Sequence, residues 1–128
     1  MKNEFMLRIL NASDSYDKIL DEKKPEFLKS CETYIGKLKS EGKLIAAQPL
    51  VREGVIISFD NGEWNEKTFK ETMEVQVGYY HILAEDMNEA IAIAKENPEF
   101  HYSPTARIEV RPIKTKEVTT DFVYPTKA

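Results

Sequence analysis

A single cysteine occurs in the chain of 128 residues. This excludes an intramolecular disulfide and a zinc site built from several thiolates. Long hydrophobic runs are also missing, because no apolar stretch approaches the ~20 residues that a membrane-spanning helix needs. The N-terminal sequence MKNEFMLRIL has neither the long apolar segment nor the small-residue cleavage site of a signal peptide. We therefore expect a soluble, cytoplasmic protein with no membrane partner.

A basic excess is missing as well. Lysine and arginine number 18 against 22 acidic residues, which gives a formal net charge of −4. Binding to nucleic acid draws on a basic surface, so we expect no nucleic-acid partner. The motifs of dinucleotide-binding, P-loop, zinc-protease, thioredoxin-like and nucleophile-elbow proteins do not occur. The two histidines show no HxxxH or HxH spacing, and we expect neither a cofactor nor a bound metal.

What the chain does contain is the composition of one globular domain. Hydrophobic residues make up 41% and charged residues 31%, values that are typical of a folded domain of this length. Segment 4–10 alternates as a strand does, with apolar residues on both faces. A polar loop over 11–23 follows, and then a helix over about 25–41 that begins with Pro25 and ends before Gly42.

The middle of the chain is predicted to be mostly extended. Asn61 and Gly62 are a strong hairpin signal, because both residues tolerate a positive φ. Residues 65–73 are predicted to be a polar connection after this hairpin. The expected strands in this part cover 44–51, 55–59, 63–64 and 74–84.

Strict alternation in the strand over 74–84 divides its side chains between two faces. One face is predicted to carry Val75, Val77, Tyr79, His81 and Leu83. The other face is predicted to carry Gln76, Gly78, Tyr80 and Ile82.

The last third of the chain is predicted to begin with a second helix. This helix starts at Asp86, which forms a pair with Glu89 that resembles a capping box, and it ends at Asn97-Pro98. The remaining expectations are a loop over 98–104, a strand over 106–113 and, over 117–124, either a last short strand or an arm on a partner.

The order of these elements, β-α-β-(β-hairpin)-β-α-β, predicts the fold class. It is the α+β, ferredoxin-like split βαβ arrangement with an inserted β-hairpin, formed by residues 1–113. Residues 114–128 then form a C-terminal arm or short strand. Two helices of this size cover only one face of a four-stranded sheet. Because the strands are apolar on both faces, we expect a homodimer whose sheets pack face to face.

Three segments carry a resemblance to a known family. They are EGKLIAAQPL (41–50), EKTFKETMEVQVGYY (66–80), and the helix DMNEAIAIAKENP (86–98) that leads to IEVRPI (108–113). In this order and spacing they resemble the YCII-related proteins, in particular the DGPF-domain branch. The resemblance implies a ferredoxin-like dimeric α+β barrel with a cleft between the sheet, the hairpin and the loop before the last strand. It implies little about a reaction, since most members are uncharacterised.

The resemblance also indicates positions of interest. Some relatives are linked to a histidine–aspartate pair proposed as catalytic, and these positions fall at Cys31 and near Ser40 here, so the pair is absent. In the segment that resembles the DGPF pattern, an acid is retained at the first position, Glu66, but the glycine and proline are not. The positions that match the pattern are Phe69, Glu71 and Thr72.

Six residues are candidates for a ligand site. As catalytic residues we predict Glu66, Glu71 and His101, and as ligand-binding residues Phe69, Tyr80 and Arg111. Paired carboxylates and a loop imidazole can transfer protons near neutral pH. Each candidate has a structural alternative: a solvated loop for the acids and the histidine, aromatic packing in a core or interface, and cross-strand ion pairing for the arginine.

Four further residues allow two interpretations each. Cys31 lies on the apolar stripe of the first helix and is interpreted as a core residue, with a reactive thiol as the alternative. His81 is either a general base or a hydrogen-bonded, packed histidine. Arg8 and Arg107 either bind an anion together with Arg111 or pair with strand glutamates.

Two functions therefore stay open. The first is a homodimeric domain that binds a small organic molecule in a polar cleft, or that acts on it as an enzyme by acid–base chemistry. The second is a non-catalytic dimeric module for interaction or regulation. No feature of the sequence indicates the identity of a ligand.

Overall fold

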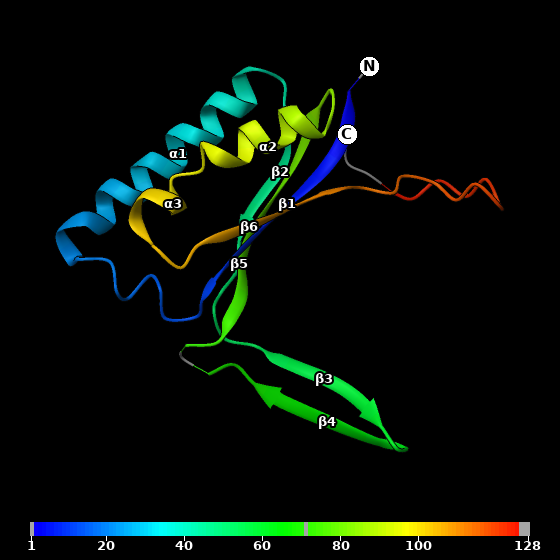
Figure 1. Cartoon of the computed structure of the whole chain (residues 1–128), viewed down its shortest axis with the longest axis horizontal. Coiled ribbons are helices and arrows are strands. Elements are labelled where there is room, and N and C mark those ends of the chain that lie inside the picture. The colour runs from blue at the N-terminus through cyan, green and yellow to red at the C-terminus, as the bar shows by residue number, and fades with distance from the viewer. Residues whose placement is uncertain (1, 71, 126–128) are drawn as a thin grey trace.

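The chain folds into two layers, with helices covering one face of an antiparallel sheet (Figure 1). The computed structural model describes residues 2–70 and 72–125. The main sheet has the strand order β2-β5-β1-β6, and a second, two-stranded sheet pairs β3 with β4. The elements are β1 (Asn3–Ala12), η1 (Asp21–Lys23), α1 (Lys24–Ser40), β2 (Leu44–Pro49), β3 (Val55–Asp60), β4 (Glu63–Thr68), β5 (Glu74–Ala84), α2 (Met87–Lys95), α3 (Glu99–Tyr102) and β6 (Arg107–Pro112).

This topology is the predicted one. The units β1-α1-β2 and β5-α2-β6 interleave their strands, and the β3-β4 hairpin is inserted between β2 and β5. The α+β, ferredoxin-like fold class is therefore confirmed. β1 and β5 form the centre of the sheet and pair along their whole length, from Asn3 opposite Ala84 to Ala12 opposite Glu74.

The core lies between the sheet and the helices. Leu7 of β1 and Ile82 of β5 are fully buried at its centre. Tyr34 of α1 packs edge-on against Tyr80 of β5, with the ring centroids 5.3 Å apart, and its hydroxyl donates to the carbonyl of Ile93 at 2.7 Å. Burial raises the pKa of Tyr34, so the hydroxyl remains a donor that ties α1 to α2.

The start of α2 and the turn of the hairpin form as predicted. The side chain of Asp86 accepts a hydrogen bond from the N–H of Glu89 at 2.9 Å, and the Glu89 carboxylate accepts one from the N–H of Glu85 at 2.7 Å. This pair satisfies donors of the first helical turn. Asn61 and Gly62 have φ values of 51° and 78°, as a tight turn between twisted strands requires.

A β-bulge in β5 makes the predicted assignment of its two faces wrong. Ile9 pairs with Gly78, but the next residue, Leu10, pairs with Gln76, so Val77 is an extra residue without an opposite partner in β1. The side chains that are buried under the helices are therefore Val75, Val77, Tyr80 and Ile82. Those on the other face are Gln76, Tyr79, His81 and Leu83.

Three predicted segments differ in their secondary structure. The predicted polar connection over 65–73 is strand as far as Thr68. Each of the six residues of β3 pairs with a residue of β4, so β4 is longer than predicted. The predicted loop over 98–104 contains the one-turn helix α3. Over 117–124, where a short strand and an arm on a partner are the two expectations, residue 123 forms an isolated bridge with residue 116 in place of a strand, and the arm stays a prediction.

The sheet face opposite the helices is not covered within the single chain, and it is not the continuous apolar surface that the sequence predicts. Arg8 donates to Gln76 and to Glu109, each at 2.9 Å. Nε2 of His81 lies 2.7 Å from Oε1 of Glu4, so this histidine is hydrogen-bonded. Half-buried apolar side chains surround these polar contacts, namely Met6, Leu10, Tyr79 and Leu83.

We expect the substitution Gly78→Ala to destabilise the fold. A Cβ at this position would lie 3.0 Å from the carbonyl oxygen of Gln48 and 3.3 Å from Cα of Pro49, which are backbone atoms of the neighbouring strand. Overpacking of this kind lowers the free energy of unfolding by about 1–3 kcal/mol, which urea denaturation measures.

Gly36→Ala in α1 is the matched control. A Cβ there meets nothing within 4 Å, so the substitution is expected to raise the free energy of unfolding by about 0.5–1 kcal/mol. Equal effects of the two substitutions would contradict the close approach of β2 to β5.

Candidate functional site

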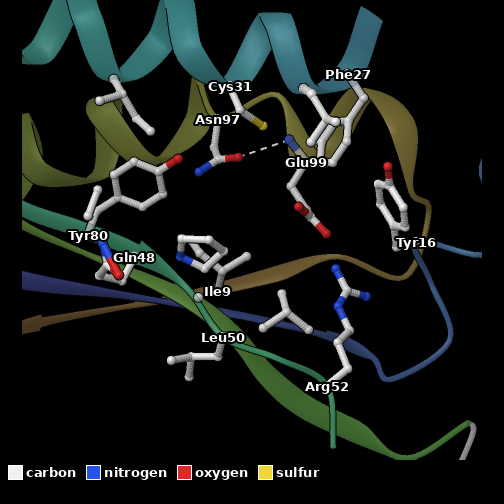
Figure 2. A pocket seen from close by; sticks show the side chains of 16 residues that line it. Ile9, Tyr16, Phe27, Cys31, Gln48, Leu50, Arg52, Tyr80, Asn97 and Glu99 are labelled. Atoms are coloured by element: carbon white, nitrogen blue, oxygen red, sulfur yellow. Dashed lines mark hydrogen bonds between the residues drawn. The ribbon is translucent and has the colours of Figure 1, made fainter. Parts of the chain in front are cut away.

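A cavity of about 320 Å³ lies between α1 and the sheet, near the end of β2 (Figure 2). Figure 2 shows α1 along one side, the strands along the other, and the segment that leads into α3 at one end. The volume falls in the range of about 300–1,000 Å³ that small-molecule sites occupy. Three other hollows of the surface are larger but more open, so the apolar lining of this cavity rather than its volume makes it the candidate site.

Most of the cavity wall is apolar. Phe27, Cys31 and Ile35 recur every fourth residue along α1 and so point to the same side of the helix. The other apolar lining residues are Ile9, Leu28, Pro49, Leu50, Ala47, Val77 and Gly78.

A buried carboxylate reaches into the cavity from α3. The side chain of Glu99 is held by Asn11, whose Nδ2 donates to Oε2 of Glu99 at 2.7 Å and to Oγ of Ser103 at 3.1 Å. Oδ1 of Asn97 accepts a hydrogen bond from the N–H of Glu99 at 2.9 Å, which fixes the first turn of α3 (Figure 2). Only 8% of Glu99 is exposed, so its carboxylate faces the cavity rather than bulk solvent (Figure 2).

A cationic side chain faces the same space from the segment after β2. Nη1 of Arg52 donates to the carbonyl of Ala12 at 3.3 Å and to the hydroxyl of Ser15. These contacts fix the guanidinium at the edge of the cavity, where Figure 2 shows it on the side opposite Glu99. The cavity thus combines apolar walls with two side chains of opposite charge.

Two further groups in the cavity stay protonated at neutral pH. Burial raises the pKa of the Cys31 thiol to about 11, and the negative charges of Glu99 and Glu32 add to this effect. Burial also raises the pKa of the Tyr80 hydroxyl, with smaller contributions from Cys31 and Glu99. Because a reactive cysteine needs a lowered pKa, we expect the thiol of Cys31 to react slowly at neutral pH.

Comparison with known proteins places the chain in a family. The family model of the YCII-related domain matches residues 5–114. The chain belongs to the YCII-related family. No curated protein matches it.

The two positions that the resemblance to YCII-related relatives indicated lie in different places. Cys31, which falls at the position of the relatives' histidine, lines the cavity. Ser40 lies at the C-terminal end of α1, where its hydroxyl donates to the carbonyl of Lys37 at 2.8 Å, and it is not among the residues that line the cavity.

Of the five sequence-predicted site residues that the structure describes, only one lies at the cavity of this YCII-related domain. Tyr80 lines it. Glu66 is exposed on β4, and His101 is exposed on α3 beside a different surface hollow. Arg111 is exposed on β6, with Nη1 3.8 Å from a carboxylate oxygen of Glu109.

Of the two remaining candidates, Phe69 does not line the cavity. Phe69 is half-buried against the hydrophobic core, with its ring beside Gly54. Glu71 lies outside the described residues. Glu66, His101, Tyr80 and Arg111 lie on the separate elements β4, α3, β5 and β6, and of these four only Tyr80 lines the cavity.

Sequence reasoning missed the charged residues of the cavity. Glu99 lies in the segment over 98–104 that was singled out for His101, but the helical turn of α3 directs Glu99 inward and leaves His101 exposed. The preceding Asn97-Pro98 was a usable signal, because it indicates a new helical start at which an acid is favoured. Arg52 had no comparable signal in the sequence around it.

The arrangement of acids and thiols in the described part of the chain bears on the chemistry. No group of three or more histidine, cysteine, aspartate or glutamate residues within it is placed to hold a metal ion. Among its cavity-lining residues, Glu99 is the only carboxylate.

No helix of the described ranges 2–70 and 72–125 is long and apolar enough to cross a membrane.

We expect alkylation of Cys31 by iodoacetamide to show the pH dependence of a buried thiol. With a pKa of about 11, the thiolate fraction near pH 8 is about one in a thousand, and the rate should rise about tenfold for each pH unit up to about pH 10. The same measurement on protein unfolded in urea is the control, because the thiol then has its ordinary pKa of about 8.5. A rate that levels off near pH 9 in the folded protein would contradict the buried position.

Proposed function

We propose that this YCII-related domain binds a small organic molecule in the cavity between α1 and the sheet. The observation that carries the proposal is the cavity itself, in which apolar walls from α1 and β2 surround the guanidinium of Arg52 and the carboxylate of Glu99. Ligand sites are typically apolar clefts with a few convergent polar groups that set the orientation of the ligand. The opposite charges of these two side chains supply such groups.

Acid–base chemistry on the bound molecule is the enzymatic form of this proposal. It would use Glu99, whose carboxylate points into the cavity, rather than the exposed Glu66 and His101. A carboxylate in a water-poor cavity can accept a proton from a bound molecule within hydrogen-bond reach. The thiol of Cys31 and the hydroxyl of Tyr80 stay protonated and serve as hydrogen-bond donors to the ligand.

We further propose that two copies form a homodimer through the open face of the main sheet. Figure 1 shows the β3-β4 hairpin and the C-terminal segment extending on the side of the sheet away from the helices. All residues of both hairpin strands are exposed, and a lone two-stranded hairpin is at best marginally stable in water. One face of this hairpin carries the apolar side chains Val55, Ile57, Phe59 and Trp64.

The same hairpin is the observation that favours the second candidate function, a non-catalytic interaction or regulatory module. Phe59 and Trp64 form an edge-to-face aromatic pair with ring centroids 4.9 Å apart, and they are 57% and 71% exposed. Large exposed aromatic side chains are typical of protein interfaces. Binding of a ligand in the cavity would distinguish the two functions, because a module that acts only through protein contacts needs no ligand there.

Occupancy of the cavity can be measured at Cys31, the only cysteine of the chain. Hexanol, hexanoate and hexylamine share one apolar chain and differ in the polar head. We expect at least one of them, at millimolar concentration, to slow the alkylation of Cys31 severalfold, because a bound molecule blocks access to the thiol. The control is the alkylation rate of a short cysteine peptide in the same solutions.

The variant Leu28→Trp adds a matched test of location. Leu28 lines the cavity but is 48% exposed, so a larger side chain there narrows the cavity without replacing a core residue. In this variant, the molecules that slow alkylation of Cys31 in the unaltered protein should no longer slow it. If neither these three molecules nor leucine slows alkylation of the unaltered protein, the proposed function is wrong.

Dimerisation can be tested by sedimentation velocity at micromolar concentration. Ile57 lies on the apolar hairpin face, whereas its neighbour Ile56 lies on the opposite face with Ser58 and Asp60. Ile57→Asn should weaken the dimer at least about tenfold, and the matched control Ile56→Asn should have little effect. Asparagine adds no charge opposite the cross-strand partners Glu66 and Lys67. An unaltered protein that sediments as a monomer would contradict the dimer.

A further inference from the structure

Among the described residues, the carboxylate of Glu99 has a neutral hydrogen-bond partner. This carboxylate accepts from the amide of Asn11, and no lysine, arginine or histidine of the described residues forms an ion pair with it. A buried carboxylate without a cation is costly, because the neutral contacts replace only part of its hydration. Since the carboxylate points into the cavity (Figure 2), a ligand that carries a positive charge would compensate it.

Arg52 is the complementary group. The two hydrogen bonds that its side chain donates to described residues both use Nη1, which leaves the N–H groups of Nε and Nη2 for a ligand. These two N–H groups lie parallel on one edge of the guanidinium and match the two oxygens of a carboxylate. Among the described residues, the arginines that form ion pairs with acidic side chains are Arg8, Arg107 and Arg111. Arg52 forms no such pair with them.

The two charges together restrict the ligand. A simple carboxylate would pair with Arg52 but would bring a second negative charge toward Glu99. A simple amine would pair with Glu99 but would bring a second positive charge toward Arg52. Like charges in a space of low polarity repel strongly, so a molecule that carries both charges fits this cavity better than a molecule with either one.

The apolar wall and the volume describe the rest of the ligand. Phe27, Leu28 and Ile35 of α1 and Leu50 after β2 provide a surface for a hydrocarbon group. The volume of about 320 Å³ corresponds to about ten water molecules in the liquid, which suits a molecule of the size of leucine or phenylalanine.

We propose that the cavity binds an apolar amino acid, with the carboxylate on Arg52, the ammonium group on Glu99 and the side chain against α1. This inference rests on the proposed function, because it names the class of ligand for the same cavity. It narrows the sequence-based expectation of a small organic molecule to one that carries both charges.

The test compares leucine with two analogues that each lack one charged group. These are 4-methylpentanoate, which lacks the amine, and 3-methylbutylamine, which lacks the carboxylate. Binding is measured by isothermal titration calorimetry on the full chain and by protection of Cys31 from iodoacetamide. We expect leucine to bind at least about tenfold more tightly than either analogue, since a hydrogen-bonded charge pair contributes that much or more.

Two variants assign the charges to their residues. Glu99→Gln keeps an acceptor for Asn11 but removes the charge, so it should lower the affinity for leucine about tenfold and leave that for 4-methylpentanoate unchanged or higher. Arg52→Gln should lower the affinity for leucine and for 4-methylpentanoate but not for 3-methylbutylamine. The controls are Glu53→Gln and Arg107→Gln, which alter exposed residues that do not line the cavity.

The possible results separate the inference from the proposed function. Tighter binding of 4-methylpentanoate, or equal binding of 2-hydroxy-4-methylpentanoate and leucine, overturns the amino-acid assignment and leaves a ligand cavity. Protection of Cys31 by hexanol but not by leucine, methionine or phenylalanine has the same meaning. If neither these molecules nor the hexyl series protect Cys31, both the inference and the proposed function fail. The comparison of ligands on the unaltered protein decides the matter even if Glu99→Gln does not fold.

Discussion

The buried carboxylate of Glu99 is the group on which the arrangement of the site depends. A negative charge in an apolar space must be solvated by fixed dipoles, and here Asn11 at the end of β1 supplies one at 2.7 Å. The amide nitrogen of Asn11 makes this contact, and its amide oxygen accepts from the hydroxyl of Thr105 at 2.6 Å. One side chain thus joins the first strand to both ends of the segment that connects α2 with β6. The polar cluster holds α3 in place and directs its acid inward.

The strands shape the remainder of the cavity. The bulge in β5 places Val77 and Gly78 on the same side of the sheet, and the absence of a side chain at Gly78 lets the backbone of β2 come close at Gln48 and Pro49. The chain then continues past β2 to Arg52, whose guanidinium is anchored on the turn after β1. The bulge in β5 and the close approach of β2 at Gly78 therefore bring the guanidinium of Arg52 opposite the carboxylate of Glu99. Helix α1 covers both side chains.

Local patterns predicted the fold well and the site poorly. Periodicity and caps located α1, α2 and the strand over 74–84, because these signals lie within a few residues of each other. The bulge could not be predicted, since one extra residue changes no local preference and shows only when β5 is paired with β1. Tyr80 was the one predicted site residue that lines the cavity. Glu99 was missed because its partner Asn11 is 88 residues away in the sequence, and its inward direction depends on the fold.

The most direct test of this account is an amide nitrogen–proton NMR titration of the isotope-labelled full chain with leucine. The account predicts that the largest chemical-shift changes occur at Arg52, Glu99 and Cys31, with the hairpin residues Ile57 and Trp64 unaffected. Changes that are largest in the hairpin or on the open face of the sheet, or no saturable change at millimolar leucine, would contradict the claim that the charged cavity is the binding site.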